Sequence, residues 1–261
     1  MKKLLALIMT LALVLTAASA LGDDFLHGID PEYPPFSYMG DDGEYTGFDV
    51  EICKAVCDLL GLEYKAVPVD WDNKLIQLDN QECDCIWSGM TILDSMKEAG
   101  YIISAPYYDN TQVLVVKKDS GIASSADLAG KAVAVQLGTS GEALLNGDLA
   151  DLTATFASLE TCQSFLVCFT ELEGNAVDAV FVDLPVAVSY LEKAAGEGRE
   201  DLVILDEQLG AEQYGIAFRA GDAELAAKIE AAVAQLVENG TYAQIAEKYP
   251  TIMNNLLFLQ P

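Results

Sequence analysis

The residues best suited to ligand chemistry begin where a short apolar run, Cys85-Ile86-Trp87, ends in Ser88-Gly89. A strand that stops at such a pair before a helix start exposes backbone N–H groups and the positive end of a helix dipole. That arrangement suits an anion such as a carboxylate. An ordinary strand-to-helix turn has the same spacing, so the rest of the chain must decide between the two interpretations.

Other polar residues also follow apolar runs. In parallel sheets such positions meet at the carboxyl edge, where ligands bind. Two of them have a simpler explanation: Asp183 could cap the following helix, and Asp30 could be a turn acid before Pro31. The whole set comprises Asp30, Trp71, Ser88, Thr91, Ser140 and Asp183.

The elements that would position these residues alternate between strands and helices. Apolar runs predict strands at 25–29, 63–69, 85–87, 111–117, 132–135, 153–156, 176–182, 202–205 and 213–219. Amphipathic spacing predicts helices that include 47–60, 93–98, 159–173, 222–238 and 241–249. Such alternation is typical of an α/β protein with mostly parallel sheets.

The pattern restarts near Lys117, which indicates a second α/β unit. The strand and helices after Asp206 are natural partners for the first unit. We therefore expect two lobes, with the second inserted in the first and two crossing strands acting as a hinge. The predicted boundaries are 1–20 for a signal peptide, 21–114 and 207–261 for lobe 1, and 115–206 for lobe 2.

The first 20 residues have the features of a secretory signal peptide. Lys2 and Lys3 precede an apolar run, and Ala18-Ser19-Ala20 offers a cleavage site near Ala20. A membrane anchor is the alternative, but the run is short and ends in small residues. No cysteine follows the cleavage point, so we expect an exported periplasmic or extracellular protein without a lipid anchor.

The chain is strongly acidic. Its formal net charge is −27, and loss of the two signal-peptide lysines makes it −29. This field repels nucleic acid and anionic lipid, which we exclude as partners.

The six cysteines form three local couples, 53/57, 83/85 and 162/168. These spacings do not favour a disulfide within a couple, and a lone histidine, His27, gives no support for a zinc site. We expect buried free thiols; a bond across couples, such as Cys57 with Cys85, remains open.

Seven segments carry a resemblance to a known family: DPEYPPF, GFDV, DWDNKLIQL, WSGMTI, PYYDNTQVLVV, LGTSGE and VDAVFVD. In this order they resemble the polar amino-acid family of extracellular solute-binding proteins, the capture components of ABC importers. The resemblance spans about Gly28 to Tyr249. It implies the two-lobed type II fold of periplasmic binding proteins.

The resemblance also implies roles for individual residues. Tyr33 and Trp71 would sandwich the ligand side chain, and Asp30 would contact its polar end. We also expect Phe36 to contact the ligand, because it belongs to the same stiff, proline-rich loop as Tyr33, which holds aromatic rings in place at low entropic cost. The α-carboxylate and α-ammonium groups would be bound by Ser88, Gly89, Met90, Thr91, Thr139, Ser140 and Asp183.

One departure from the family pattern concerns the ligand carboxylate. The family places an arginine four residues beyond the isoleucine matching Ile92, where this chain has Met96 or, counted backwards from Ser104, Lys97. Lys97 could supply charge but not a planar bidentate fork. Loss of such a charged pair would cost on the order of 2–5 kcal/mol. Either Lys97 takes over this role, or the ligand lacks an ordinary α-carboxylate.

We therefore expect a binding protein that captures a small polar solute, an amino acid first of all, and delivers it to the membrane permease of an ABC importer. The alternative ligand is a cationic amine. We expect a monomer without catalytic residues, cofactor or metal, because hydrolase, metalloprotease and phosphate-loop motifs are absent. A dehydratase on the same fold would need more cationic residues, and a sensory domain would need an output domain.

Overall fold

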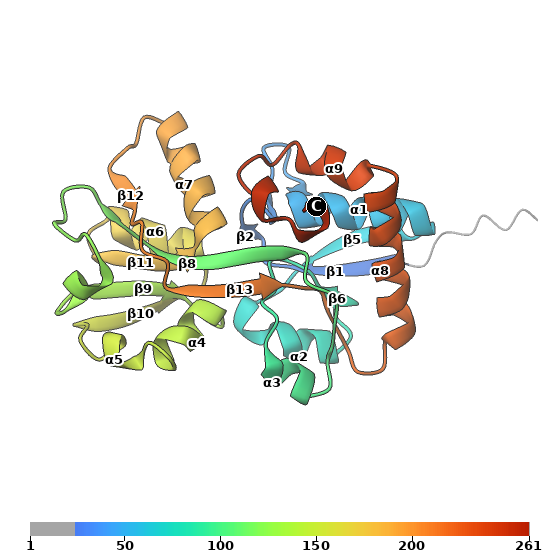
Figure 1. Cartoon of the computed structure of the whole chain (residues 1–261), viewed down its shortest axis with the longest axis horizontal. Coiled ribbons are helices and arrows are strands. Elements are labelled where there is room, and N and C mark those ends of the chain that lie inside the picture. The colour runs from blue at the N-terminus through green and yellow to red at the C-terminus, as the bar shows by residue number, and fades with distance from the viewer. Residues whose placement is uncertain (1–23, 261) are drawn as a thin grey trace, which may run out of the picture.

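The computed structural model describes residues 24–260, so the predicted signal peptide at 1–20 lies outside the described residues. The described chain forms two α/β lobes joined by two long strands (Figure 1). Within 24–260, no helix combines the length and the apolar character that crossing a membrane would require.

Lobe 1 is built on a five-stranded sheet in the order β5-β1-β6-β14-β7. Strands β1, β5 and β6 are parallel, whereas β14 runs antiparallel to β6 and β7. The sheet comprises β1 (Asp24–Ile29), β5 (Glu63–Pro68), β6 (Cys85–Ile86), β7 (Ile102–Ile103) and β14 (Ala217–Phe218). Its helices are α1 (Phe48–Leu60), α2 (Lys74–Asp79), α3 (Asp94–Glu98), α8 (Ala223–Glu238) and α9 (Thr241–Ala246), and its 3-10 turns are η1 (Trp71–Asn73), η3 (Met253–Asn255) and η4 (Leu257–Leu259).

The proline-rich loop after β1 contains short strands that the sequence did not predict. They are β2 (Glu32–Tyr33), β3 (Ser37–Met39) and β4 (Tyr45–Thr46), which form a three-stranded antiparallel sheet. Tyr33 pairs with Ser37 in this sheet. The pairing fixes the loop that carries the predicted aromatic residues.

Lobe 2 contains a six-stranded mixed sheet with the path β10-β9-β11-β8-β12, and β13 pairs with β8 beside it. Its strands are β8 (Tyr108–Lys117), β9 (Ala132–Gln136), β10 (Ser158–Cys162), β11 (Ala179–Asp183), β12 (Leu202–Ile204) and β13 (Gly210–Tyr214). Its helices are α4 (Ser140–Asn146), α5 (Ala150–Thr153), α6 (Phe165–Glu173) and α7 (Leu184–Gly196), with a 3-10 turn η2 (Ser125–Leu128).

Strands β8 and β13 carry the chain into and out of lobe 2, and they pair antiparallel with each other (Figure 1). The predicted boundary at 114/115 falls inside β8, and that at 206/207 falls just before β13. The single strand predicted at 213–219 is wrong. It is two strands, β13 and β14, which belong to different sheets.

The predicted strand at 153–156 and helix at 159–173 are also wrong in their positions. Residues 150–153 are helical, and the strand is β10, which pairs in parallel with β9. The helix starts only at Phe165 because Ser164 is its N-cap and accepts a hydrogen bond from the N–H of Val167. The capping serine, Ser164, was the missed signal.

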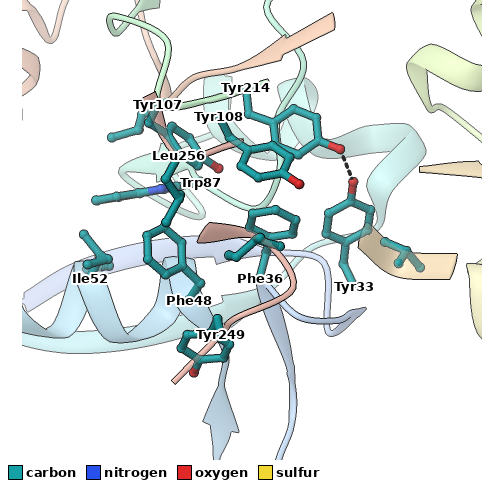
Figure 2. Packing of buried hydrophobic residues seen from close by; sticks show 14 of the residues in the cluster. Tyr33, Phe36, Phe48, Ile52, Trp87, Tyr107, Tyr108, Tyr214, Tyr249 and Leu256 are labelled. Atoms are coloured by element: carbon teal, nitrogen blue, oxygen red, sulfur yellow. Dashed lines mark hydrogen bonds between the residues drawn. The ribbon is translucent and has the colours of Figure 1, made fainter. Parts of the chain in front are cut away.

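The largest core cluster extends from lobe 1 into lobe 2 through a chain of aromatic rings. Figure 2 shows Phe36 beneath the stacked pair of Tyr108 and Tyr214, whose ring centroids lie 5.3 Å apart. All six cysteines are buried and free, so the expectation of buried free thiols is confirmed.

The start of α1 depends on glycine at position 47. Its φ is +121°, and an added Cβ would lie 2.3 Å from the carbonyl oxygen of Phe36. We expect Gly47→Ala to lower the free energy of unfolding by about 3 kcal/mol or more, measured by urea unfolding.

Gly43→Ala is the matched control. Its φ is +81°, but an added Cβ would meet no atom within 4 Å. Backbone strain alone should therefore cost about 1–2 kcal/mol. Equal losses for the two variants would contradict the role of the close contact at Gly47.

Candidate functional site

The two lobes meet where the strands of each sheet end, and side-chain hydrogen bonds cross between them there. Gln136 Nε2 donates to Asp30 Oδ2 over 2.7 Å, and Lys74 Nζ donates to the carbonyl oxygen of Gly138 over 2.7 Å. Thr91 Oγ1 donates to Ser140 Oγ over 3.1 Å. The structure therefore has its lobes closed on each other.

A cavity of about 350 Å³ remains between the closed lobes. Its lobe 1 walls are Trp71, Lys74, Met90, Thr91 and Leu93, and its lobe 2 walls are Gly138, Thr139, Ser140, Glu142, Ala143 and Asn146. Five residues predicted from the sequence are thus brought together: Trp71, Met90, Thr91, Thr139 and Ser140.

Lys74 is the basic residue of this cavity, and the sequence analysis missed it. It begins α2, and its Nζ lies 4.7 Å from the ring centroid of Trp71 and also donates to the Trp71 carbonyl oxygen over 2.9 Å. Burial lowers the pKa of Lys74 to about 8, although Asp72, Asp30 and Glu142 act in the opposite direction. Its position in DWDNK, beside the predicted cleft tryptophan, was the available signal.

Lys97 lies elsewhere. Its side chain is 53% exposed on α3 and pairs with Asp94 at 3.5 Å, and it does not line the cavity. The neighbouring Met96 is buried in the lobe 1 core. Because successive helical residues point about 100° apart, α3 turns Lys97 to solvent when Met96 faces inward. The structure thus disagrees with a role for Lys97 at the ligand carboxylate.

The Ser88-Gly89 turn faces the interior of lobe 1 rather than the cleft. Ser88 Oγ accepts a hydrogen bond from the N–H of Asp30 at 3.0 Å, and the Gly89 N–H donates to Asp49 Oδ2 over 2.8 Å. Neither group is free to bind an anion. The Ser88 hydroxyl, which also pairs with the Ser37 hydroxyl, and the Gly89 N–H are therefore already engaged, whereas the backbone N–H of Ser88 donates to no residue within 24–260.

The turn instead positions its neighbours. The φ of Gly89 is +55°, and an added Cβ would lie 2.3 Å from the ring of Tyr33. The backbone N–H groups of Met90 and Thr91 donate no hydrogen bond to any residue within 24–260. With the N–H of Ser88 they are the remaining backbone donors in this segment.

Asp183 ends β11 and is buried. Although it occupies the N-cap position of α7, its side chain makes no capping hydrogen bond, so the capping explanation is wrong. It accepts hydrogen bonds from Asn110 Nδ2 at 2.5 Å and Gln112 Nε2 at 2.7 Å. Both amides also donate to Glu212 Oε1, over 2.7 Å and 3.1 Å.

Two carboxylates thus share one pair of amide donors. Burial, followed by the nearby Glu212, raises the pKa of Asp183 well above its usual range. Two close acids favour either a shared proton or a cation between them. Glu212, like Asn110 and Gln112, lay outside the set of residues predicted from the sequence.

Two aromatic residues of the predicted site, Tyr33 and Phe36, occupy different positions. The hydroxyl of Tyr33 lies 2.7 Å from that of Tyr214 (Figure 2). It also lies near Asp183. Phe36 is fully buried and packs against Tyr33, with 5.7 Å between ring centroids. The structure therefore places Phe36 behind Tyr33, as support for its ring.

Asp30 is buried at the end of β1. Burial raises its pKa, while the hydrogen bond from Gln136 acts in the opposite direction. Its Oδ1 also accepts the N–H of Glu32 at 2.9 Å, so it is both a turn acid and a contact between the lobes. Among residues 24–260, no group of His, Cys, Asp and Glu side chains is arranged to hold a metal ion.

Comparison with known proteins identifies the family of this chain. A sequence model of the bacterial extracellular solute-binding proteins, family 3, matches residues 26–251. The L-arginine-binding protein of Pseudomonas aeruginosa is 34% identical over 255 residues, which cover 95% of this chain and 96% of that protein. The L-cystine-binding protein TcyJ of Escherichia coli K12 is 32% identical over 226 residues, which cover 86% and 81%.

Among solved structures, an ABC uptake transporter substrate-binding protein from Streptococcus pneumoniae with bound histidine matches with a TM-score of 0.83. The two chains are 29% identical, and the match covers 91% of this chain and 95% of the other. The likeness therefore extends over both lobes.

Two α/β lobes, one inserted in the other and closed over a cavity, define the type II fold of periplasmic binding proteins. The chain belongs to the bacterial extracellular solute-binding proteins, family 3. It is a solute-binding protein of the kind that serves ABC transporters, and the family resemblance expected from the sequence is confirmed.

Asp49, which holds Gly89, makes stability depend on pH. Burial raises its pKa from 3.8 to about 7. The folded protein therefore holds the Asp49 proton more tightly than the unfolded chain does. The resulting stabilisation of the fold is complete below the unfolded-state pKa of Asp49 and is lost as pH rises through its folded-state pKa. Such a rise corresponds to on the order of 4 kcal/mol.

His27 acts in the opposite sense, because burial lowers its pKa to about 4. The test is therefore a comparison with Asp49→Asn, in which His27 is unchanged. Between about pH 4 and 7.5, urea unfolding should show wild type losing several kcal/mol relative to the variant. A difference between the two proteins that does not change with pH would contradict this account.

Proposed function

We propose that this protein captures an amino acid between its lobes and delivers it to the permease of an ABC importer. The observation that carries the proposal is the arrangement of opposite charges in the cleft. Asp183 and Glu212 lie together on the hinge side, and Lys74 with two hydroxyl groups lies in the cavity. A zwitterion needs both kinds of partner.

At the carboxylate end of the ligand, we assign to Lys74 the binding role that an arginine has in the family. The Lys74 ammonium has three N–H donors, of which the carbonyl oxygens of Trp71 and Gly138 accept two. The hydroxyls of Thr91 and Ser140 lie in the same cavity. An anionic group there would stabilise the charged form of a lysine whose pKa burial has lowered.

At the ammonium end we assign Asp183 and Glu212. Tyr33 and Tyr214, whose hydroxyls bond to each other, lie close to Asp183 and form the aromatic side of this region. An ammonium group would replace the proton that two close carboxylates otherwise share. This assignment keeps the predicted role of Asp183 and adds a second acid.

The remaining groups favour a neutral or cationic ligand side chain. Asp30 is buried at the lobe contact, Glu142 lines the cavity, and Lys74 is the basic wall residue. Aspartate and glutamate would add a further carboxylate to this acidic surrounding. The similar proteins named for arginine and histidine have ligands whose side chains carry no carboxylate, and L-cystine carries its second carboxylate together with a second ammonium group.

Closure of the lobes would retain the solute and present one surface to the permease. Gly138 permits close approach, since a Cβ on it would lie 2.5 Å from Cα of Asp72 in the other lobe. We infer that the protein is exported after cleavage near Ala20 and works as a monomer.

Screening the mature protein by thermal unfolding tests the proposal. Arginine, histidine, glutamine or cystine, at about 100-fold above Kd, should stabilise it by about 2.7 kcal/mol, whereas glutamate and aspartate should have no effect. If none of the amino acids stabilises the protein while an amine without a carboxylate does, the amine ligand is correct and the amino-acid proposal is wrong.

A second prediction concerns the two lysines. Lys74→Met should weaken binding of the stabilising amino acid at least tenfold, about 1.4 kcal/mol or more, because its carboxylate loses a charged donor. Lys97→Met, the matched control on α3, should change the Kd less than about twofold. Isothermal titration calorimetry measures both.

The control ligand is the amine that remains when the same amino acid loses its α-carboxylate. It distinguishes a loss of carboxylate recognition from a general loss of lobe closure. Its binding should be nearly as strong to Lys74→Met as to wild type. An equal loss for both ligands would contradict the assignment of Lys74 to the carboxylate.

A further inference from the structure

The segment 253–260, which follows α9, runs along one edge of the hinge strand β8. Leu256 forms an isolated antiparallel bridge with Tyr108, and the N–H of Leu257 donates to the carbonyl oxygen of Tyr107 over 2.9 Å. Leu256 is fully buried in the largest core cluster. Because the segment belongs to lobe 1, these contacts fasten the start of β8 to lobe 1.

The side chain of Asn255 adds a polar contact at the same place. Its Nδ2 donates to the carbonyl oxygen of Asp109 over 3.0 Å, and the side chain also lies near the hydroxyl of Tyr108. The first bond joins residues that are 146 positions apart in the chain. One side chain thus contacts both the backbone and an aromatic ring at the start of β8.

Tyr108 is the second member of a row of four paired residues. It pairs with Leu256 on one edge and, through β13, with Tyr214 on the other. Tyr214 is in turn bridged to Thr91, and two backbone hydrogen bonds of 2.8 Å and 2.9 Å flank that bridge. The order across the row is therefore Leu256, Tyr108, Tyr214 and Thr91. Because paired segments lie at a fixed spacing of about 4.8 Å, a shift of one member displaces the next.

The far end of the row reaches the proposed binding site. Tyr214 stacks on Tyr108, and its hydroxyl lies 2.7 Å from that of Tyr33. Thr91 lines the cavity between the lobes, and its hydroxyl donates to Ser140 of lobe 2 over 3.1 Å. The segment 253–260 itself lies outside the cavity walls. Any effect of this segment on the ligand must therefore pass through the row.

We propose that Asn255 is a positioning residue for the cleft. By holding the start of β8 from lobe 1, it keeps Tyr214 and Thr91 where the ligand meets them, without touching the ligand itself. Its effect on affinity rests on the function proposed above. A protein in which the binding arrangement is populated only part of the time binds its ligand more weakly in proportion to that fraction.

Calorimetric titration of the full mature chain tests the effect on affinity. Asn255→Ala should weaken binding of the stabilising amino acid about fivefold, and binding of its decarboxylated amine by the same factor, because the row supports both ends of the ligand. Lys74→Met differs, since it should weaken binding of the amino acid alone. Asn254→Ala, at the exposed neighbouring position, is the matched control and should change either Kd less than about twofold.

Amide hydrogen exchange without any ligand tests the row directly. The N–H groups of Ile92 and Gly215 make the two hydrogen bonds that flank the last bridge of the row. In Asn255→Ala both should exchange at least about threefold faster than in wild type, because loss of a contact at one edge favours local opening of the row. The Val69 amide, which donates to the Ile29 carbonyl oxygen in lobe 1, should exchange at an unchanged rate.

The proposal is overturned if the Ile92 and Gly215 amides exchange at the wild-type rate in Asn255→Ala. An equal rise for the Val69 amide also overturns it, because that would indicate a general loss of stability, and so does equal binding of one ligand by wild type and Asn255→Ala. If wild type binds neither amino acid nor amine, the proposed function fails, and the exchange rates alone then decide whether Asn255 positions the row.

Discussion

Within residues 24–260 the chain passes between the lobes only through β8 and β13, and this constraint shapes the whole cleft. The two strands pair antiparallel from Gly210 opposite Gln112 to Tyr214 opposite Tyr108. They also carry Asn110, Gln112 and Glu212, the residues that surround Asp183. A ligand group bound at Asp183 therefore contacts the connection between the lobes itself, which links recognition to the relative position of the lobes.

Closure of the lobes buries acidic side chains in a protein that is itself strongly acidic. Burial raises the pKa of both Asp30 and Asp183, and it lowers the pKa of Lys74. Buried charges without partners are unfavourable, so a closed cleft is most stable when its contents complete the pairing. In our proposal the ammonium and carboxylate of the ligand supply the missing partners, and closure is favoured when the solute is present.

Much of the fold could be predicted from the sequence because strand ends and helix starts carry local signals. Asp183 and Ser140 follow directly from such signals, whereas Thr139 came from the family resemblance; the structure places all three at a strand end or a helix start. Lys74 could not be found from spacing alone, because whether the first residue of α2 points into the cleft depends on packing between the lobes. Glu212 was missed for a related reason: it meets Asp183 only through the pairing of β13 with β8. Phe36 and Ser88 were placed in the right loops, but local signals do not reveal which side of a loop faces the core.

Closure of the lobes around the solute is the central claim, and a distance across the cleft tests it most directly. Spin labels on cysteines introduced at the exposed positions Asp94 and Asp148, outside the cavity walls, would report the separation of α3 and the segment that follows α4, since the native cysteines are buried. With the stabilising amino acid at saturation, double electron–electron resonance should give one narrow distance distribution, centred at a shorter distance than that of the ligand-free protein. An unchanged distribution at saturation would contradict the account.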